Sequence, residues 1–411
     1  MASTTLINTA DAAEIRLVHF LGDHDATSPF VLSCESAIQN SDAAQLLSTI
    51  IQHQPAIDRL IQSEEGVGAF SLLATLLDKV PADQQITLMK ALVSSVENST
   101  VDAPLDHKLR CLCGLYNLRS GADKCWILAR ILNLSAFHGD DEQVLNLLPD
   151  RKSTLGNLLQ GSNLERLLMG FENGGNQEQR ALFSIASKVV GKLAEVCRAR
   201  DMGKEADAAD CSKQRFLLKM LATYSNLSEV DDEARAAAKQ AAVGAICDPV
   251  TLFNELRIIM SLPPVTALKS TDGEIYQLLE IFQQGKLEDF QSFQKSNPSA
   301  LSNNNISEED AIRNMRLLSL CSLATEHEEI PYDAIAQTLQ VEQSEVENWV
   351  ISAVSSGLLS AKMDQLQHVV MVERCVVRRF GIEQWKILQE RLNVWKKNVR
   401  TVLDGLKQSQ V

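Results

Sequence analysis

The stretch from residue 307 to residue 377 constrains the fold of this chain most, because its pattern gives six elements in a fixed order. Ser307 followed by Asp310 is typical of a helix start, and apolar residues then recur at a period near 3.6 up to Leu323. A short strand around Ile330, two more helices and two alternating strands follow. The order helix, strand, helix, helix, strand, strand predicts a winged helix.

The third helix of this stretch starts near Glu342 and ends at Gly357, a residue that favours the left-handed backbone of a helix end. Its inward side is predicted to hold apolar residues at helical spacing, namely Val346, Trp349, Val350 and Val354. Residues 358–363 and 368–372 then alternate as two strands around a turn. These two strands form the hairpin known as the wing.

A winged helix most often binds nucleic acid through its third helix, and contact with phosphate requires positive charge. Between Glu342 and Ser356 the chain has three glutamates and neither lysine nor arginine. Nucleic acid would be repelled by such a helix. We therefore predict that the module docks proteins.

The rest of the 411-residue chain predicts an all-helical body. It is 45% hydrophobic but only 5% aromatic, and strand-like runs are rare before residue 358. Helices of similar length follow one another in pairs without a strict repeat motif, which favours a helical-repeat solenoid. We expect an irregular segment at 1–40 with one candidate helix at Ala10–Leu21, and helical repeats at 41–205. Helical pairs at 206–300 should lead into the winged helix at 307–377, followed by a terminal helix and tail at 378–411.

The last helical stretch carries a sustained heptad seam. Its apolar residues fall at alternating spacings of three and four: Trp385, Leu388, Leu392, Trp395, Val399, Val402 and Leu406. This period is typical of a coiled coil or a helical bundle. Packing against the chain's own solenoid is the alternative. The strict period, the terminal position and the two tryptophans favour a partner helix, because aromatic residues concentrate at interfaces.

Charge is distributed unevenly along the chain. The net charge is −14, but residues 374–411 carry nine basic against three acidic side chains, a net +6, which leaves −20 for residues 1–373. Such asymmetry steers association with a partner. Candidates for contact with RNA or with an acidic partner are Arg374, Arg378, Arg379, Lys396, Lys397 and Arg400. A solvated outer face, or pairing with acidic neighbours, is the preferred interpretation.

Catalytic and cofactor motifs are absent from the sequence. There is no phosphate-binding loop, nucleophile elbow or paired-histidine metal motif. The nine cysteines are an odd number and are scattered through helical segments, which favours reduced thiols. No signal peptide and no membrane span is evident. We expect a non-enzymatic, cytoplasmic protein without cofactor or metal.

An acidic winged helix after helical pairs, followed by a bundling helix, resembles the PCI domain family. The resemblance covers roughly residues 206–377 and the tail, and is carried by Asn314–Leu318, Trp349–Ile351, Lys362–Gln365, Gln384-Trp385 and Trp395-Lys396. Scaffold subunits of the proteasome lid, of the deneddylating signalosome and of eukaryotic translation initiation factor 3 share this domain. The resemblance is strongest to the initiation-factor members.

The resemblance implies a non-catalytic scaffold, in which wing strands join winged helices into an arc and terminal helices gather in a bundle. An open strand edge would explain the first contact, and we expect it at Val369, Val370, Met371, Val372 and Glu373. The implied partners are other PCI subunits of initiation factor 3 and, through the complex, the small ribosomal subunit. The alternatives are a scaffold of the proteasome lid or signalosome, and RNA binding through the basic tail.

Overall fold

A computed structural model describes residues 9–23, 25, 27–63, 66–99, 105–138, 140–148, 168, 176–249, 259–378 and 382–408. The chain divides into two compact units, Met1–Thr223 and Tyr224–Val411. The predicted boundary at 205/206 is wrong, because it falls inside the continuous helix Gly203–Ala222. The division follows that helix instead of interrupting it.

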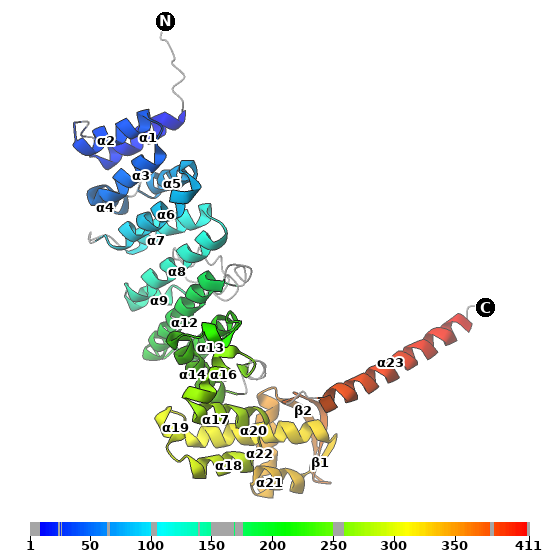
Figure 1. The fold of residues 1–411 in the computed structure, drawn as a ribbon. Coiled ribbons are helices and arrows are strands. Elements are labelled where there is room, and N and C mark those ends of the chain that lie inside the picture. Colours follow the sequence, from blue (N-terminus) through cyan, green and yellow to red (C-terminus); the bar gives the residue numbers. More distant parts are fainter. Residues whose placement is uncertain are drawn as a thin grey trace. The chain divides into compact units, whose positions relative to one another are not determined.

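The first unit is built of stacked helices. They are α1 (Thr9–Leu21), α2 (Pro29–Gln39), α3 (Ala43–Gln52), α4 (Gln54–Gln62), α5 (Gly66–Leu76), η1 (Leu77–Lys79), α6 (Ala82–Glu97), α7 (Leu105–Leu118), α8 (Gly121–Phe137), α9 (Asp141–Leu145), α12 (Asn176–Ala199) and α13 (Gly203–Ala222). Figure 1 shows them following one another, and each packs mainly on helices near it in sequence, as α12 does on α13. This arrangement is the predicted helical-repeat solenoid.

Within the segment 1–40 that was predicted to be irregular, α1 agrees with the candidate helix at Ala10–Leu21, whereas α2 was not predicted. Pro29 opens α2, where its fixed φ and missing N–H suit the first turn. Phe30, Val31 and Cys34 then bury one face of the helix. The ring of Phe30 stacks on that of His53 with centroids 4.2 Å apart. The apolar spacing was present in the sequence, but the polar surroundings concealed it.

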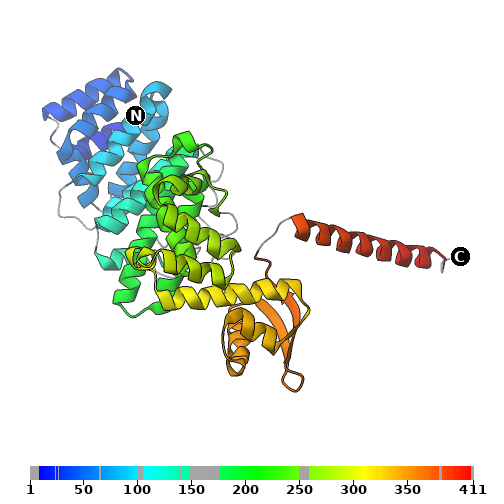
Figure 2. The same ribbon diagram turned by 60° about the horizontal axis from the view of Figure 1, so that its bottom comes forward.

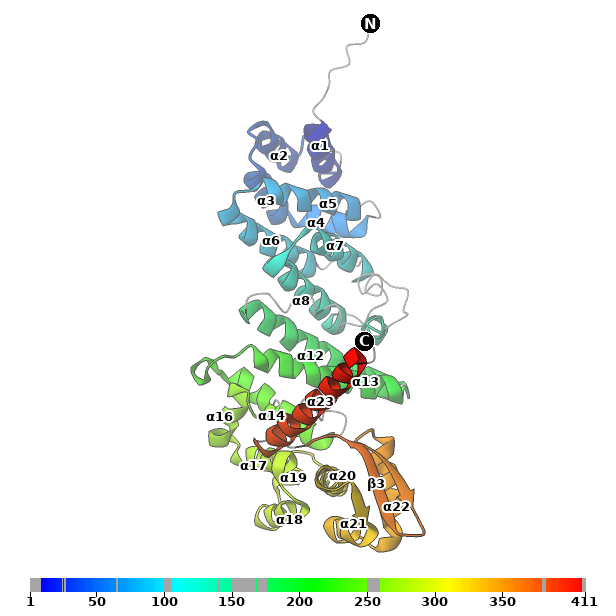
Figure 3. The ribbon, with the colours of Figure 1, turned by 90° about the vertical axis from the view of Figure 1, so that its right-hand side faces the viewer.

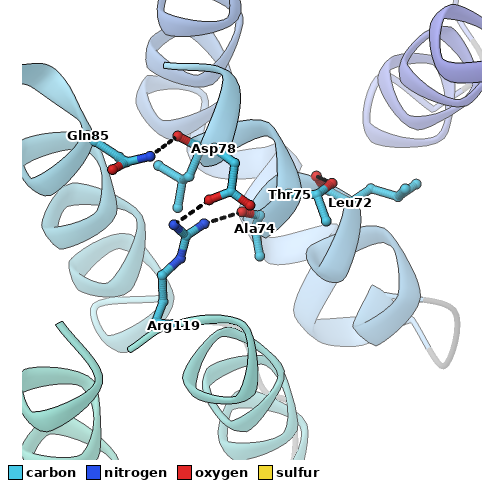
Figure 4. Close-up of polar contacts among 7 residues, drawn as sticks. Leu72, Ala74, Thr75, Asp78, Gln85 and Arg119 are labelled. Atoms are coloured by element: carbon cyan, nitrogen blue, oxygen red, sulfur yellow. Dashed lines mark hydrogen bonds and ion pairs between the residues drawn. The ribbon is translucent and has the colours of Figure 1, made fainter. Parts of the chain in front are cut away.

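A buried arginine ties three elements of the first unit together (Figure 4). Arg119, between α7 and α8, has a side chain only 8% exposed. Its guanidinium pairs with Asp78 of η1 at 2.7 Å and donates to the carbonyl of Ala74 near the end of α5. Nearby, Gln85 of α6 donates to the carbonyl of Leu77 at 2.6 Å. These bonds satisfy carbonyls at helix ends, so the cluster is structural.

The second unit contains helical pairs, the winged helix and a terminal helix. Its elements are η2 (Leu227–Glu229), α14 (Asp232–Cys247), α16 (Pro263–Thr271), α17 (Gly273–Gln284), α18 (Leu287–Ser296), α19 (Ala300–Asn303), α20 (Glu308–Glu326), β1 (Glu329–Pro331), α21 (Tyr332–Leu339), η3 (Gln343–Glu345), α22 (Val346–Ser355), β2 (Leu359–Asp364), β3 (Val369–Cys375) and α23 (Ile382–Gln408). The predicted winged-helix order is confirmed. The long C-terminal helix is confirmed as well.

Helix α20 is central to this unit and contacts α14, α18, α21, α22 and β3. The hydroxyl of Ser307 accepts a hydrogen bond from the backbone N–H of Asp310 at 3.3 Å, which starts the helix as predicted. Two polar side chains of α20 cap neighbouring helices. Asn314 donates to the carbonyl of Cys247 at 2.9 Å, and Arg316 donates to that of Leu339 at 3.0 Å. Polar residues of α20 thus satisfy the ends of α14 and α21.

The three strands form one antiparallel sheet in the order β1-β3-β2. Figure 2 shows this sheet beside the end of α20, where the thiol of Cys375 in β3 lies 3.4 Å from the carbonyl of Ala324. Ile330 of β1 pairs with Val370 of β3, and both side chains are buried. Gly357 has φ +73° after α22, as predicted for a helix end.

Candidate partner-binding surfaces

The wing sheet offers an open strand edge, but not the one that the sequence indicated. The predicted edge at Val369–Glu373 lies in β3, which is labelled in Figure 3. β3 is the central strand of the sheet. Val370 pairs with Ile330 of β1 on one side and with Met363 of β2 on the other. The prediction is wrong because β1, although only three residues long, pairs with β3 along the side that was expected to be open. The outer strands are therefore β1 and β2.

Of these two strands, β2 is the better acceptor for a further strand. β1 ends at Pro331, which lacks a backbone N–H. β2 runs for six residues, Leu359–Asp364. On its exposed face, Lys362 pairs with Glu373 of β3 at 2.6 Å, and this contact raises the pKa of Lys362 and lowers that of Glu373. The pair links the two strands without covering the outer edge of β2.

The turn of the wing is held by several hydrogen bonds. The carboxylate of Asp364 accepts from the backbone N–H groups of Leu366 and Gln367, both at 3.0 Å. Gln365 donates to Glu347 of α22 at 3.1 Å, and the same carboxylate accepts from the hydroxyl of Tyr332 at 3.2 Å. The wing is thereby fixed to the helices beneath it, and β2 is presented as a preformed edge.

Helix α22 presents no positive charge. Val346, Val350 and Ala353 are buried, as the helical spacing requires. Val354, which was predicted to point inward, is exposed, because Ala353 takes the inward position one residue earlier. Trp349 is half-buried beneath the guanidinium of Arg316, whose carbon lies 5.4 Å from the ring centroid. The exposed surface of α22 is acidic and apolar, so it is unsuited to contact with the phosphates of nucleic acid.

Arg378 was a candidate for contact with RNA, but it is buried, with only 5% of the residue exposed to solvent. Its guanidinium donates to the carbonyls of Phe282 at 2.7 Å and of Ile281 at 2.9 Å, at the end of α17. It also donates to the hydroxyl of Ser322 on α20 at 3.4 Å. Burial lowers the pKa of Arg378 to about 10, so it stays charged at neutral pH. The side chain fastens the end of the winged helix to α17 and α20.

The remaining basic candidates are on the surface where they are described. Arg374 in β3 is exposed, as are Lys396, Lys397 and Arg400 in α23. Arg379 lies outside the described residues. The predicted basic cluster is therefore split by the buried Arg378 into a residue on the wing and a group on the terminal helix.

Helix α23 keeps the predicted heptad seam in contact with solvent. Trp385 is 61% exposed and Trp395 is 66% exposed. Leu388, Leu392, Val399 and Val402 are exposed as well. The side chain of Leu406 lies outside the described part of the chain, although its backbone belongs to the helix. A 27-residue helix with an exposed apolar face is a candidate docking element, because isolated proteins rarely expose large apolar patches.

No metal or redox site emerges from the described residues. Among them, no group of three or more His, Cys, Asp or Glu side chains is arranged to hold an ion. Burial raises the pKa of the thiols of Cys111 and Cys321 to about 12 and that of Cys125 to about 11. These thiols stay protonated at neutral pH and behave as small apolar side chains. No described helix has the length and hydropathy to cross a bilayer.

Two family models match the chain. The PCI domain model matches residues 288–374, and the model described as eIF3 subunit M, C-terminal helix, matches residues 378–406. The second match falls on α23 and its seam. The first covers α18, α20 and the winged helix almost to the end of β3.

Similar proteins from three organisms carry one shared name, eukaryotic translation initiation factor 3 subunit M. The protein of Dictyostelium discoideum is 27% identical, over 84% of this chain and 80% of the relative. That of Pyricularia oryzae is 28% identical, over 91% of this chain and 84% of the relative. That of Nematostella vectensis is 34% identical, over 47% of this chain and 49% of the relative.

Proposed function

We propose, from the premise that this chain contains a PCI domain and resembles the M subunit of eukaryotic translation initiation factor 3, that it is a non-catalytic scaffold subunit of that factor. It would act in the cytoplasm, where the assembled factor binds the small ribosomal subunit and supports the initiation of protein synthesis. Its own role is to hold other subunits in place, through the wing and through α23.

The observation that carries this proposal is the exposed seam of α23. A helix with two exposed tryptophans and a strict heptad period gains most of its stabilisation when partner helices cover it. Two further apolar side chains, Ile382 and Leu403, are exposed beside the seam and widen it. Such a broad face fits a bundle of several helices better than a two-stranded coil.

The second contact proposed is strand addition at β2. An edge strand of six residues that is held in place by its neighbours offers backbone hydrogen bonds without further ordering. A neighbouring PCI subunit that adds a strand at Leu359–Asp364 would extend the sheet into the arc that the resemblance implies. This edge replaces the one predicted at Val369–Glu373.

The proline variants Ala361→Pro and Lys362→Pro test this edge as a pair. Successive N–H groups of a strand point to opposite sides, so one variant breaks the bond to β3 and the other removes only an outward donor. Thermal unfolding identifies which variant keeps the fold. That variant should assemble less well than the unchanged chain. Equal assembly would contradict strand addition at β2.

Affinity purification of the tagged chain from cytosol, with mass spectrometry, tests the function itself. We expect other initiation-factor 3 subunits and small-subunit ribosomal proteins to co-purify. Recovery of proteasome-lid or signalosome subunits instead would contradict the assignment to translation, while it would keep the PCI scaffold. RNA binding by the tail loses support, because Arg378 is buried and the acidic α22 lies in the same domain.

A further inference from the structure

The charges of α23 are arranged by position relative to its seam. With Trp385, Leu392 and Val399 at heptad position a, and Leu388, Trp395 and Val402 at d, positions e and g border the seam on its two sides. Position e holds Ile382, Gln389, Lys396 and Leu403, and position g holds Gln384, Arg391, Asn398 and Gly405. The only charges on these borders are those of Arg391 and Lys396, and both side chains are exposed.

By heptad position, the acidic residues of the same helix all fall opposite the seam. Glu383, Glu390 and Asp404 occupy position f, opposite the seam. Lys397 shares position f and Arg400 is at position b, so both also face away. The helix therefore carries mixed charge on its outer face and only positive charge beside its apolar face. Net charge alone does not require this separation.

This separation disfavours a second copy of the chain as the partner. In a parallel pair of helices, position g faces position e of the partner five residues further on. Arg391 would then face the partner's Lys396, and the same repulsion would occur on the opposite side. Like charges brought together at an interface oppose association and exclude wrong partners. A partner surface with carboxylates beside an apolar groove would instead attract the two positively charged borders.

We propose that α23 docks into an apolar groove between helices of a protein partner, and that Asp or Glu side chains on the two sides of this groove pair with Arg391 and Lys396. This inference rests on the proposed function and adds the chemistry of the partner. RNA is the weaker candidate, because phosphates would pair with the cations but would leave both tryptophans of the seam exposed to water.

Charge reversal with a matched control tests the proposal in the full chain. Arg391→Glu with Lys396→Glu reverses the two borders, whereas Lys397→Glu with Arg400→Glu makes the same change in net charge on the outer face. All four residues are exposed in the chain alone, so neither variant should lower its thermal stability. We expect the border variant to lose roughly tenfold or more in recovery of identified initiation-factor subunits, and the control to stay within about twofold.

Other outcomes contradict the proposal in distinguishable ways. Equal losses in both variants would indicate attraction by net charge, as expected for RNA, and no loss in either would show that the borders face no carboxylates. In both cases the unchanged chain still recovers initiation-factor subunits, so the proposed function stands. An unchanged chain that recovers none of them would contradict the proposed function, and this inference with it.

Zero-length carbodiimide cross-linking of the purified complex locates the carboxylates directly, since this reagent joins a lysine only to a carboxylate in contact with it. We expect Lys396 to form cross-links to Asp or Glu of partner helices, and Arg391→Lys to add a second site. Cross-links from Lys386 and Lys397 alone, with none from Lys396, would overturn the proposal.

Discussion

Helices α20 and α23 have similar apolar periods and opposite environments. Both belong to the second unit, with 19 and 27 residues. Met315, Leu318 and Cys321 of α20 are completely buried. Trp385 and Trp395 of α23, at positions equally well suited to a core, are more than half exposed. The apolar period of a helix therefore does not reveal whether its partner lies in the same chain.

The difference identifies what each helix contributes. A fully buried leucine or methionine stabilises a fold by roughly 1.5–3 kcal/mol, and α20 contributes several such side chains to its own domain. The seam of α23 contributes little until another helix covers it. In the proposed function, burial of this seam against another helix stabilises an assembly instead of a fold.

Amide hydrogen exchange should show the largest contrast between the two helices. Buried amides of α20 open only with the domain, so we expect them to exchange on the order of 10³-fold or more slowly than amides of an unprotected chain. An isolated helix in water is only marginally stable, so amides of α23 should show little protection. Protection of α23 equal to that of α20 in the free chain would mean that its seam packs on this chain after all.

A pair of alanine substitutions compares how much the two helices contribute to the free energy of unfolding. Leu318→Ala in α20 should lower the free energy of unfolding by roughly 2–5 kcal/mol, because it leaves a cavity in the core. Leu392→Ala in α23 should change it by less than about 0.5 kcal/mol, because the side chain is already exposed. Urea unfolding of the two variants measures both values. A similar loss of unfolding free energy in both variants would contradict the distinction between a buried α20 and an exposed α23.

Arg378 marks the point where the chain passes from buried to exposed. Arg378→Met keeps the bulk of the side chain but removes the donors to Ile281 and Phe282, and we expect a loss of about 2–3 kcal/mol in the free energy of unfolding. Arg400→Met on α23 should be nearly neutral. Arg378→Lys should fall between the two, because it keeps the charge without the planar fork. A neutral Arg378→Met variant would contradict the structural role given to this residue.

Hydroxyl groups at the two helices should give the smallest contrast. Ser307→Ala removes the N-terminal cap of α20 and should cost about 1 kcal/mol. The hydroxyl of Thr401 in α23 donates to the carbonyl of Lys397 at 3.1 Å within the helix, so Thr401→Ala should not destabilise the chain. Thermal unfolding of both variants under the same conditions is the measurement. A larger loss for Thr401→Ala would show that α23 contributes to the fold.

Local patterns were sufficient to predict the elements of the winged helix. The cap at Ser307, the positive φ of Gly357 and the two strands of the wing depend on residues close together in sequence. The heptad seam was likewise visible, because a period of 3.5 is a property of one helix. These are the features on which sequence and structure agree.

Contacts between distant segments could not be predicted in the same way. β3 is the central strand because it also pairs with β1, which lies about 40 residues earlier in the sequence. The burial of Arg378 depends on carbonyls of α17, nearly 100 residues away. An arginine in a basic stretch gives no sign that it caps a helix end. The β2 edge was overlooked for the same reason, since strand order is a property of the assembled sheet.

The most direct test of the central claim is the distribution of the tagged chain in a density gradient of cell extract. The seam variant changes Trp385, Leu388, Leu392 and Trp395 to Ala. A control variant makes the same number of alanine changes on the outer face, at Lys386, Glu390, Asn393 and Lys397. Thermal unfolding of both purified chains verifies that the fold is intact.

We predict that the unchanged chain and the control sediment with the initiation factor, while the seam variant remains in the light fractions at its normal unfolding temperature. Loss of four interface side chains corresponds to roughly 100-fold weaker association or more. A folded seam variant that still sediments with the complex would contradict the claim that α23 holds this chain in its assembly.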